Sequence, residues 1–146
     1  MSRDVFLNGS FIDENQASLS AADRGFTLGD GVFDTMLAAD GTLVDADAHF
    51  TRLIAHAGVL KIPVAMSVSD FIKTANHLVI PSSDHRIAVR TAISRGPGER
   101  GLAPPDRPQP TILMRASSAP DPATLPPPRL IIAQSVRRNE HSPLSR

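Results

Sequence analysis

Two arginines in this chain have the type and spacing that could do chemistry. Arg52 stands three positions after His49 in the stretch Ala48–Leu53, and Arg100 lies near the end of the glycine-rich stretch Ile93–Gly101. A guanidinium is planar, stays charged and donates two parallel hydrogen bonds, so it suits phosphates and carboxylates. The sequence therefore offers two candidate anion-binding groups, although a solvated helix residue and a flexible basic loop are the ordinary alternatives.

Composition and spacing argue against several other chemistries. The 146 residues contain no cysteine, which excludes disulfides, thiolate nucleophiles and thiolate metal sites. His49 and His56 lie seven positions apart, too far for a simple two-histidine metal pair, and no carboxylates converge, so we expect no metal site. A net charge of zero and the absence of tryptophan and tyrosine argue against nucleic acid as a partner. No stretch is long and apolar enough to suggest a signal peptide or a membrane span.

Turn residues and periodicity predict the elements that must position the arginines. Asn8-Gly9 favours a tight hairpin between strands at 5–7 and 11–12, and Asp40-Gly41 turns a strand at 31–38 into residues 42–44. Helical spacing predicts two helices, the first capped by Asp45 or Asp47 and the second by Ser67 or Ser69. Their apolar stripes are Phe50, Leu53, Ile54, Ala57 and Leu60, and Phe71, Ile72, Ala75, Leu78 and Val79.

The second half of the chain predicts three further strands and a linker. Residues 86–95 alternate as a strand does, and strands at 111–116 and 129–136 flank the proline-rich stretch 117–128. This order predicts an α+β fold, with two helices packed on a mainly antiparallel sheet. We expect an N-terminal domain at 1–116, an interdomain linker at 117–128 and the start of a truncated C-terminal domain at 129–146.

Three segments resemble the class IV (fold-type IV) pyridoxal-phosphate enzymes. This group includes branched-chain and D-amino-acid aminotransferases and the aminodeoxychorismate lyases. The segments are Ala22–Thr35, with its pattern DRG…GDGVF, Ala48–Leu53, with H-x-x-R-L, and Ile93–Gly101, with SRGxGxRG. Together with the tail, the resemblance covers essentially all of this chain but only about the first half of a typical family member.

The resemblance implies roles for four residues. Arg52 would bind the phosphate of pyridoxal 5'-phosphate, and Arg100, from a neighbouring subunit, would bind a substrate carboxylate. Phe33 and Arg90 would line the substrate pocket, with a charge at the sheet rim as the alternative reading of Arg90. Three departures bear on substrate choice: Phe33 and Ala88 replace tyrosines found in relatives, and Leu102 replaces the histidine of the D-amino-acid enzymes.

The lysine that such an enzyme needs is not apparent in this chain. Only Lys61 and Lys73 are present, and neither matches the family's position. The tail 135–146 resembles the stretch that leads to the Schiff-base lysine, which we therefore expect just after Arg146, so that no catalytic residue is in this chain. A fragment of a longer product, an incompletely recorded chain and a natural short form without activity all stay open.

The resemblance implies the N-terminal part of a pyridoxal-phosphate-dependent aminotransferase, which transfers an amino group between a small amino acid or amine and a 2-oxo acid. An aminodeoxychorismate lyase, which releases 4-aminobenzoate for folate synthesis, is the alternative within the family. A catalytically dead dimerisation or ligand-binding module is the alternative of another class. The resemblance implies a homodimer, and the absence of cysteine fits a cytoplasmic protein.

Overall fold

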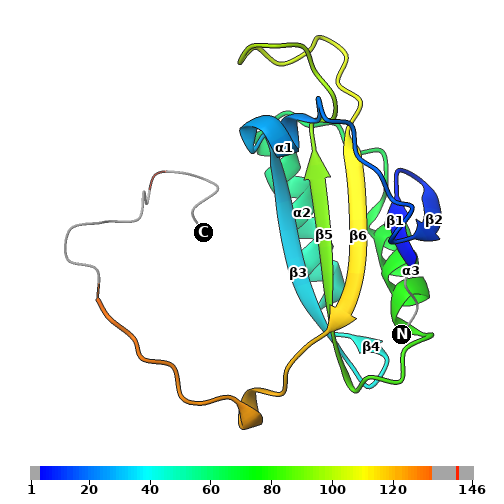
Figure 1. Cartoon of the computed structure of the whole chain (residues 1–146), viewed down its shortest axis with the longest axis vertical. Coiled ribbons are helices and arrows are strands. Elements are labelled where there is room, and N and C mark those ends of the chain that lie inside the picture. The colour runs from blue at the N-terminus through cyan, green and yellow to red at the C-terminus, as the bar shows by residue number, and fades with distance from the viewer. Residues whose placement is uncertain (1–3, 133–140, 142–146) are drawn as a thin grey trace.

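Six strands form one antiparallel sheet in the order β2-β1-β6-β5-β3-β4 (Figure 1). The structure is a computed structural model that describes residues 4–132 and 141. The strands are β1 (Asp4–Leu7), β2 (Ser10–Asp13), β3 (Gly31–Ala39), β4 (Thr42–Leu43), β5 (Arg86–Ser94) and β6 (Thr111–Ser118). β3, β5 and β6 are the long strands, and their pairing makes up most of the sheet.

The two predicted tight turns are confirmed. Asn8 and Gly9 have φ values of 49° and 97°, and they join β1 to β2. Asp40 and Gly41 have φ values of 47° and 77°, and they join β3 to β4. Glycine, asparagine and aspartate tolerate positive φ better than other residues, which explains why these pairs stand where the chain reverses.

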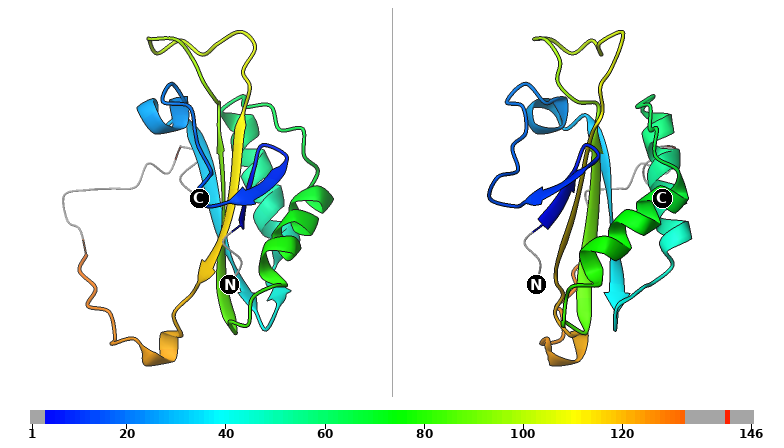
Figure 2. Two further views of the ribbon diagram at one scale, coloured as in Figure 1. Left: turned by 45° about the vertical axis from the view of Figure 1, so that its right-hand side comes forward. Right: turned by 90° about the vertical axis from the view of Figure 1, so that its right-hand side faces the viewer.

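Two long helices cover one face of the sheet (Figure 2). They are α2 (Ala46–Val59) and α3 (Val68–Val79). Ser67 caps α3 in a capping box: its hydroxyl accepts from the Asp70 N–H, and Asp70 Oδ2 accepts from the Ser67 N–H. Asp45 stands at the N-cap of α2 as expected, although its side chain makes no capping hydrogen bond.

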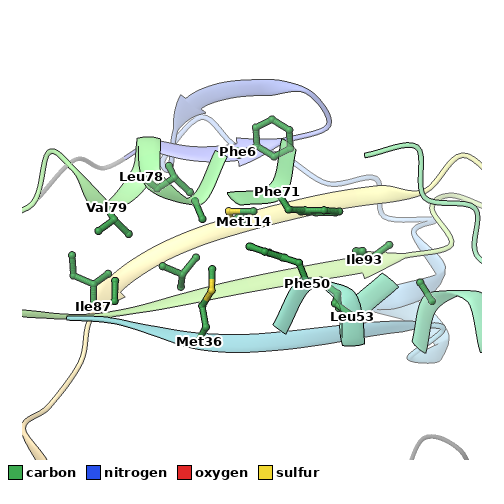
Figure 3. Packing of buried hydrophobic residues seen from close by; sticks show 14 of the residues in the cluster. Phe6, Met36, Phe50, Leu53, Phe71, Leu78, Val79, Ile87, Ile93 and Met114 are labelled. Carbon is green, nitrogen blue, oxygen red and sulfur yellow. The ribbon is translucent and has the colours of Figure 1, made fainter. Parts of the chain in front are cut away.

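The core lies between these helices and the sheet (Figure 3). Phe50 of α2 and Phe71 of α3 stack with ring centroids 5.1 Å apart, and Met114 of β6 is fully buried. The predicted stripes point inward, with Ile54, Leu60 and Ile72 only partly buried. The other buried members are Phe6, Met36, Ala38, Leu53, Ala57, Ile62, Ala75, Leu78, Val79, Ile87, Val89 and Ile93.

The expected α+β fold is confirmed, with differences in detail. A short helix α1 (Arg24–Leu28) occupies the glycine-rich stretch before β3, where no helix was expected. β6 runs to Ser118, past the predicted boundary at residue 116, and a 3-10 turn, η1 (Pro122–Thr124), follows in the linker.

The predicted strand at 129–136 is wrong over residues 129–132, which form no strand. A strand needs a hydrogen-bonding partner, and no described strand lies beside this segment. Residues 133–136, and all of the tail 135–146 except His141, lie outside the described residues. The described part of the chain contains no helix that is both long and apolar enough to cross a bilayer.

Candidate functional site

Phe33 and Arg90 meet on the face of the sheet opposite α2 and α3. The guanidinium carbon of Arg90 lies 3.6 Å from the centroid of the Phe33 ring, a cation–π contact. β3 and β5 position the pair, because Phe33 is in register with Ala92 and Arg90 with Thr35 on the neighbouring strand. The two residues for which the resemblance implies a place in the substrate pocket are therefore in contact.

A cavity of about 420 Å³ lies beside this pair. Its walls are mainly apolar, with Leu19, Phe26, Val32 and Leu113 among them, and Arg90 is the one cation among the described lining residues. Small-molecule sites commonly combine apolar walls with a few placed polar groups. This cavity can accept a small molecule that has an apolar part and a carboxylate.

Asp23 forms the polar base of the cavity, and its carboxylate already has partners. Asp23 Oδ2 accepts from the Ser94 and Thr111 hydroxyls at 2.9 and 2.7 Å, and Oδ1 accepts from the Gly25 N–H at 2.8 Å. The last bond caps α1. Because all these groups satisfy one another, Asp23 holds α1 against β5 and β6 and has a structural role.

Arg52 lies on the other side of β3, where Asp34 holds it. Arg52 Nε and Nη2 donate to the two carboxylate oxygens of Asp34 at 2.9 and 2.8 Å, which is a bidentate pair. His49 Nδ1 lies 2.9 Å from Asp34 Oδ1. A carboxylate only accepts, so that contact requires a proton on Nδ1, which then cannot also accept from Arg52 Nη2 at 3.0 Å.

This arrangement fixes Arg52 without using all of its donors. Its Nη1 makes no hydrogen bond within the described residues, and its side chain is 49% exposed, whereas that of Asp34 is 12% exposed. A fixed guanidinium with free N–H groups can bind an anion with little loss of conformational entropy. Arg52 is therefore held in place with donors left for an anion, and no sequence signal pointed to Asp34, the residue that holds it.

The Phe33–Arg90 pair and the Arg52 cluster (Asp34, His49 and Arg52) lie on opposite faces of β3, at the same edge of the sheet. Phe33 and Asp34 are consecutive on β3, so their side chains point to opposite faces of the sheet. β4 pairs only with Ala38 and Ala39, and the Leu37 carbonyl accepts from the Val44 N–H just after β4, so residues 31–36 have no strand partner on that edge among the described residues. A ligand that approaches this edge can reach both groups.

Arg100 does not join the other three predicted site residues. It is exposed on the loop between β5 and β6, and it lines hollows formed by that loop and α1 rather than the cavity beside Phe33. In Figure 1 this loop projects from the end of the sheet where α1 lies. The described chain by itself thus places Arg100 away from the pocket.

Asp30 is the centre of a second charged cluster that the sequence did not reveal. Its carboxylate accepts from Nε of both Arg24 and Arg95 at 2.8 Å, and from Arg95 Nη2 at 3.0 Å. The hydrogen bonds from Arg95 and then from Arg24 lower the pKa of Asp30, against an opposing effect of burial. Asp30 is therefore ionised at neutral pH and holds two buried arginines.

The two lysines of the chain do not contribute to either site. Lys61 follows α2 and Lys73 lies on α3, and both are exposed. Neither lines the cavity beside Phe33. The described residues also contain no group of three or more histidine or acidic side chains that could hold a metal ion.

Comparison with known structures assigns a class to this fold. The fold matches the branched-chain amino acid aminotransferase of Escherichia coli with a TM-score of 0.75 over 82% of this chain and 42% of that one, at 17% identity. A hypothetical aminotransferase from Mycobacterium tuberculosis in its PLP-bound form matches with a TM-score of 0.65, at 28% identity, over 80% of this chain and 40% of that one.

Sequence relatives and a family profile agree with the structural matches. The D-alanine aminotransferase of Staphylococcus haemolyticus is 31% identical over 115 residues, which cover 78% of this chain and 41% of that protein. A putative branched-chain-amino-acid aminotransferase of Methanocaldococcus jannaschii is 32% identical over 116 residues, 80% of this chain and 40% of that protein. The profile of the amino-transferase class IV family matches residues 31–146.

The chain belongs to the class IV aminotransferase family. It spans about two-fifths of the length of the curated relatives that it matches. The predicted family and the α+β fold are thereby confirmed. The roles of Arg52, Phe33, Arg90 and Arg100 stay predictions.

Proposed function

We propose that this chain is the N-terminal part of a pyridoxal-phosphate-dependent aminotransferase. The full-length protein would transfer an amino group between a small amino acid or amine and a 2-oxo acid. Curated relatives are named as D-alanine and branched-chain aminotransferases, and the Mycobacterium tuberculosis structure is in a PLP-bound form. No observation favours the aminodeoxychorismate lyase or the non-catalytic module over this function.

The observation that carries the proposal is the Arg52 cluster at the β3 edge. Asp34 fixes the guanidinium by two hydrogen bonds, while Nη1 stays free for an anion. A phosphate on Nη1 would lie near the edge of β3, one residue from Phe33. The residues present thus fit the phosphate of the cofactor, which supplies an electron sink for amino-group transfer when it is bound.

The substrate would occupy the cavity on the other side of that edge. Arg90, held over the Phe33 ring, offers a cation for a carboxylate, and the apolar walls exclude water from the substrate side chain. Arg100 would complete carboxylate recognition in a homodimer, where it reaches the site of the neighbouring subunit. The proposed dimer rests on the family resemblance, and the proposed cytoplasmic location rests on the absence of cysteine.

The amine that holds the cofactor would come from a lysine just after Arg146, on a second domain. The segment Leu130-Ile131-Ile132 supports such a domain, because these side chains are 89%, 94% and 91% exposed. Three consecutive apolar residues exposed to water are unfavourable by about 1.5–3 kcal/mol each relative to full burial. We propose that residues 129–146 begin that domain, after a linker that follows β6 and extends to residue 128.

Absorbance spectroscopy of two purified proteins tests the proposal. With added pyridoxal 5'-phosphate, the full-length product should show a visible band of lysine-linked cofactor, and borohydride should abolish it. The 146-residue chain should show no such band, because Lys61 and Lys73 lie away from the Arg52 edge. A full-length product without the band, or a stable band in the short chain, would contradict the proposal.

A further inference from the structure

A single buried side chain holds the loop that carries Arg100. Arg24 Nη1 donates to the carbonyls of Gly101 and Ala103 at 3.3 and 3.1 Å, and Nη2 donates to that of Leu102 at 2.9 Å. Arg24 is 4% exposed, so these bonds are protected from water. Three successive peptide groups of an otherwise exposed loop are thus bound by one guanidinium that lies 77 or more positions earlier in the chain.

Asp30 orients this guanidinium. Its Oδ2 accepts from Arg24 Nε at 2.8 Å, which leaves both Nη groups directed to the loop. The same carboxylate binds Arg95, which donates to the carbonyls of Leu60 and Lys61 just after α2, the helix that carries Arg52. One acidic residue therefore connects the Arg100 loop with the Arg52 helix.

The backbone around the loop is shaped to fit the Arg24 side chain. A Cβ on Gly98 would lie 2.8 Å from Arg24 Cδ, so this position has room only for glycine while Arg24 stays in place. The Gly98 N–H donates to the Ala22 carbonyl at 3.1 Å, and the Arg24 N–H donates to that of Gly96 at 2.9 Å. These contacts fix the start of the loop beside α1.

We propose that Arg24, oriented by Asp30, is a positioning residue for Arg100. It sets the conformation of residues 101–103 and thereby the place from which Arg100 meets a substrate carboxylate. This inference rests on the proposed substrate-binding role of Arg100. Arg24 itself contacts neither substrate nor cofactor in this account, since its side chain bonds, among the described residues, to Asp30 and to the carbonyls of residues 101–103.

Arg24→Lys is the informative substitution, with Arg86→Lys as its matched control. An ammonium keeps the charge beside Asp30, but it lacks the planar fork that reaches three carbonyls. Arg86 also donates to a carbonyl, that of Pro120 at 3.3 Å, and it lies at the opposite end of β5 from the loop. The control thus makes the same chemical change at a guanidinium–carbonyl contact that the inference does not involve.

Loop order can be measured with a spin label on Leu102→Cys in the full-length protein. Residues 1–146 contain no cysteine, and the Leu102 side chain is 82% exposed, so labelling there is selective once any cysteine beyond Arg146 is replaced by serine. Electron paramagnetic resonance should show restricted label motion in the parent and with Arg86→Lys, and faster motion with Arg24→Lys. Unchanged motion with Arg24→Lys would overturn the inference.

Steady-state kinetics of the holoenzyme separates this inference from the function on which it rests. Arg24→Lys should raise KM for the 2-oxo acid by roughly tenfold or more and change kcat less, since a misplaced binding group weakens substrate capture. If Arg100→Ala raises KM while Arg24→Lys does not, the positioning role is wrong. If Arg100→Ala leaves KM unchanged, the proposed role of Arg100 is wrong, and the positioning role fails with it.

A second variant keeps the test decisive if Arg24→Lys does not fold. Gly98→Ala retains Arg24 but pushes a methyl group against its Cδ. It should also raise label mobility at position 102 and KM for the 2-oxo acid. A folded Gly98→Ala protein with parental label motion and parental KM would overturn the inference.

Discussion

Removal of the Arg52 side chain should weaken binding of the phosphorylated cofactor specifically. The perturbation is Arg52→Ala in the full-length protein, and the ligands are pyridoxamine 5'-phosphate and pyridoxamine, which differ only in the phosphate. The free Nη1 of Arg52 can donate charge-assisted hydrogen bonds to that phosphate.

The magnitude follows from the exposure of the site. A hydrogen bond to a charged group contributes about 1.5–3 kcal/mol, and the 49% exposure of Arg52 places the loss near the lower end, at about 2 kcal/mol. That corresponds to a roughly 30-fold increase in Kd for pyridoxamine 5'-phosphate. The Kd for pyridoxamine should change by no more than about twofold, since it lacks the group that Arg52 binds.

Equilibrium dialysis of both ligands against parent and variant measures these changes. Arg115→Ala is the matched control, because Arg115 of β6 forms an exposed ion pair with Glu14, just after β2, and is not part of the Arg52 cluster. Thermal unfolding followed by circular dichroism checks that the variants fold. Equal weakening of both ligands, or none, would refute a phosphate-binding role for Arg52.

Three further substitutions test how the fold supports the site. Asp30→Asn should cost roughly 3 kcal/mol of unfolding free energy at neutral pH, because two buried arginines lose their counter-ion. The pKa of Asp30 is lowered in the folded protein, so Asp30 stabilises the fold fully above its unfolded pKa of about 3.9, and this stabilisation is lost as the pH falls through the folded pKa. Urea unfolding from pH 7 to 2 should therefore show a smaller decrease in the free energy of unfolding for Asp30→Asn than for the parent. Ser67→Ala should cost about 1 kcal/mol in urea unfolding through loss of the α3 cap, and no loss would contradict the capping box. Gly96→Ala should cost about 2 kcal/mol or more, because φ is 84° and the new Cβ would lie 1.7 Å from the Gln109 carbonyl oxygen; a parental melting temperature would contradict that geometry.

Local signals in the sequence were sufficient for most of the fold. The Asn8-Gly9 turn, the Ser67 cap and the apolar spacing around Phe50 and Phe71 each specify an element through contacts within a few residues. Helix α1 was missed even though its ends carry ordinary signals, with Asp23 as the N-cap and Gly29 at φ 67° as the C-cap. Its five residues are too short for a periodic apolar stripe.

The supporting residues of the site could not be predicted because their partners are distant in sequence. Asp34 meets Arg52 across 18 positions, and Asp30 meets Arg95 across 65. Such pairs depend on how α2 and β5 pack beside β3, which a one-dimensional pattern does not encode. The strand predicted at 129–136 failed over 129–132 for the converse reason: its apolar residues satisfy the pattern, but the described chain offers no partner strand.

A crystal structure of the full-length protein with pyridoxal 5'-phosphate tests the central claim most directly. The account predicts a phosphate oxygen within hydrogen-bonding distance, about 2.7–3.2 Å, of Arg52 Nη1, with Asp34 still bound to Nε and Nη2. A phosphate bound elsewhere, with Arg52 held by Asp34 alone, would contradict it.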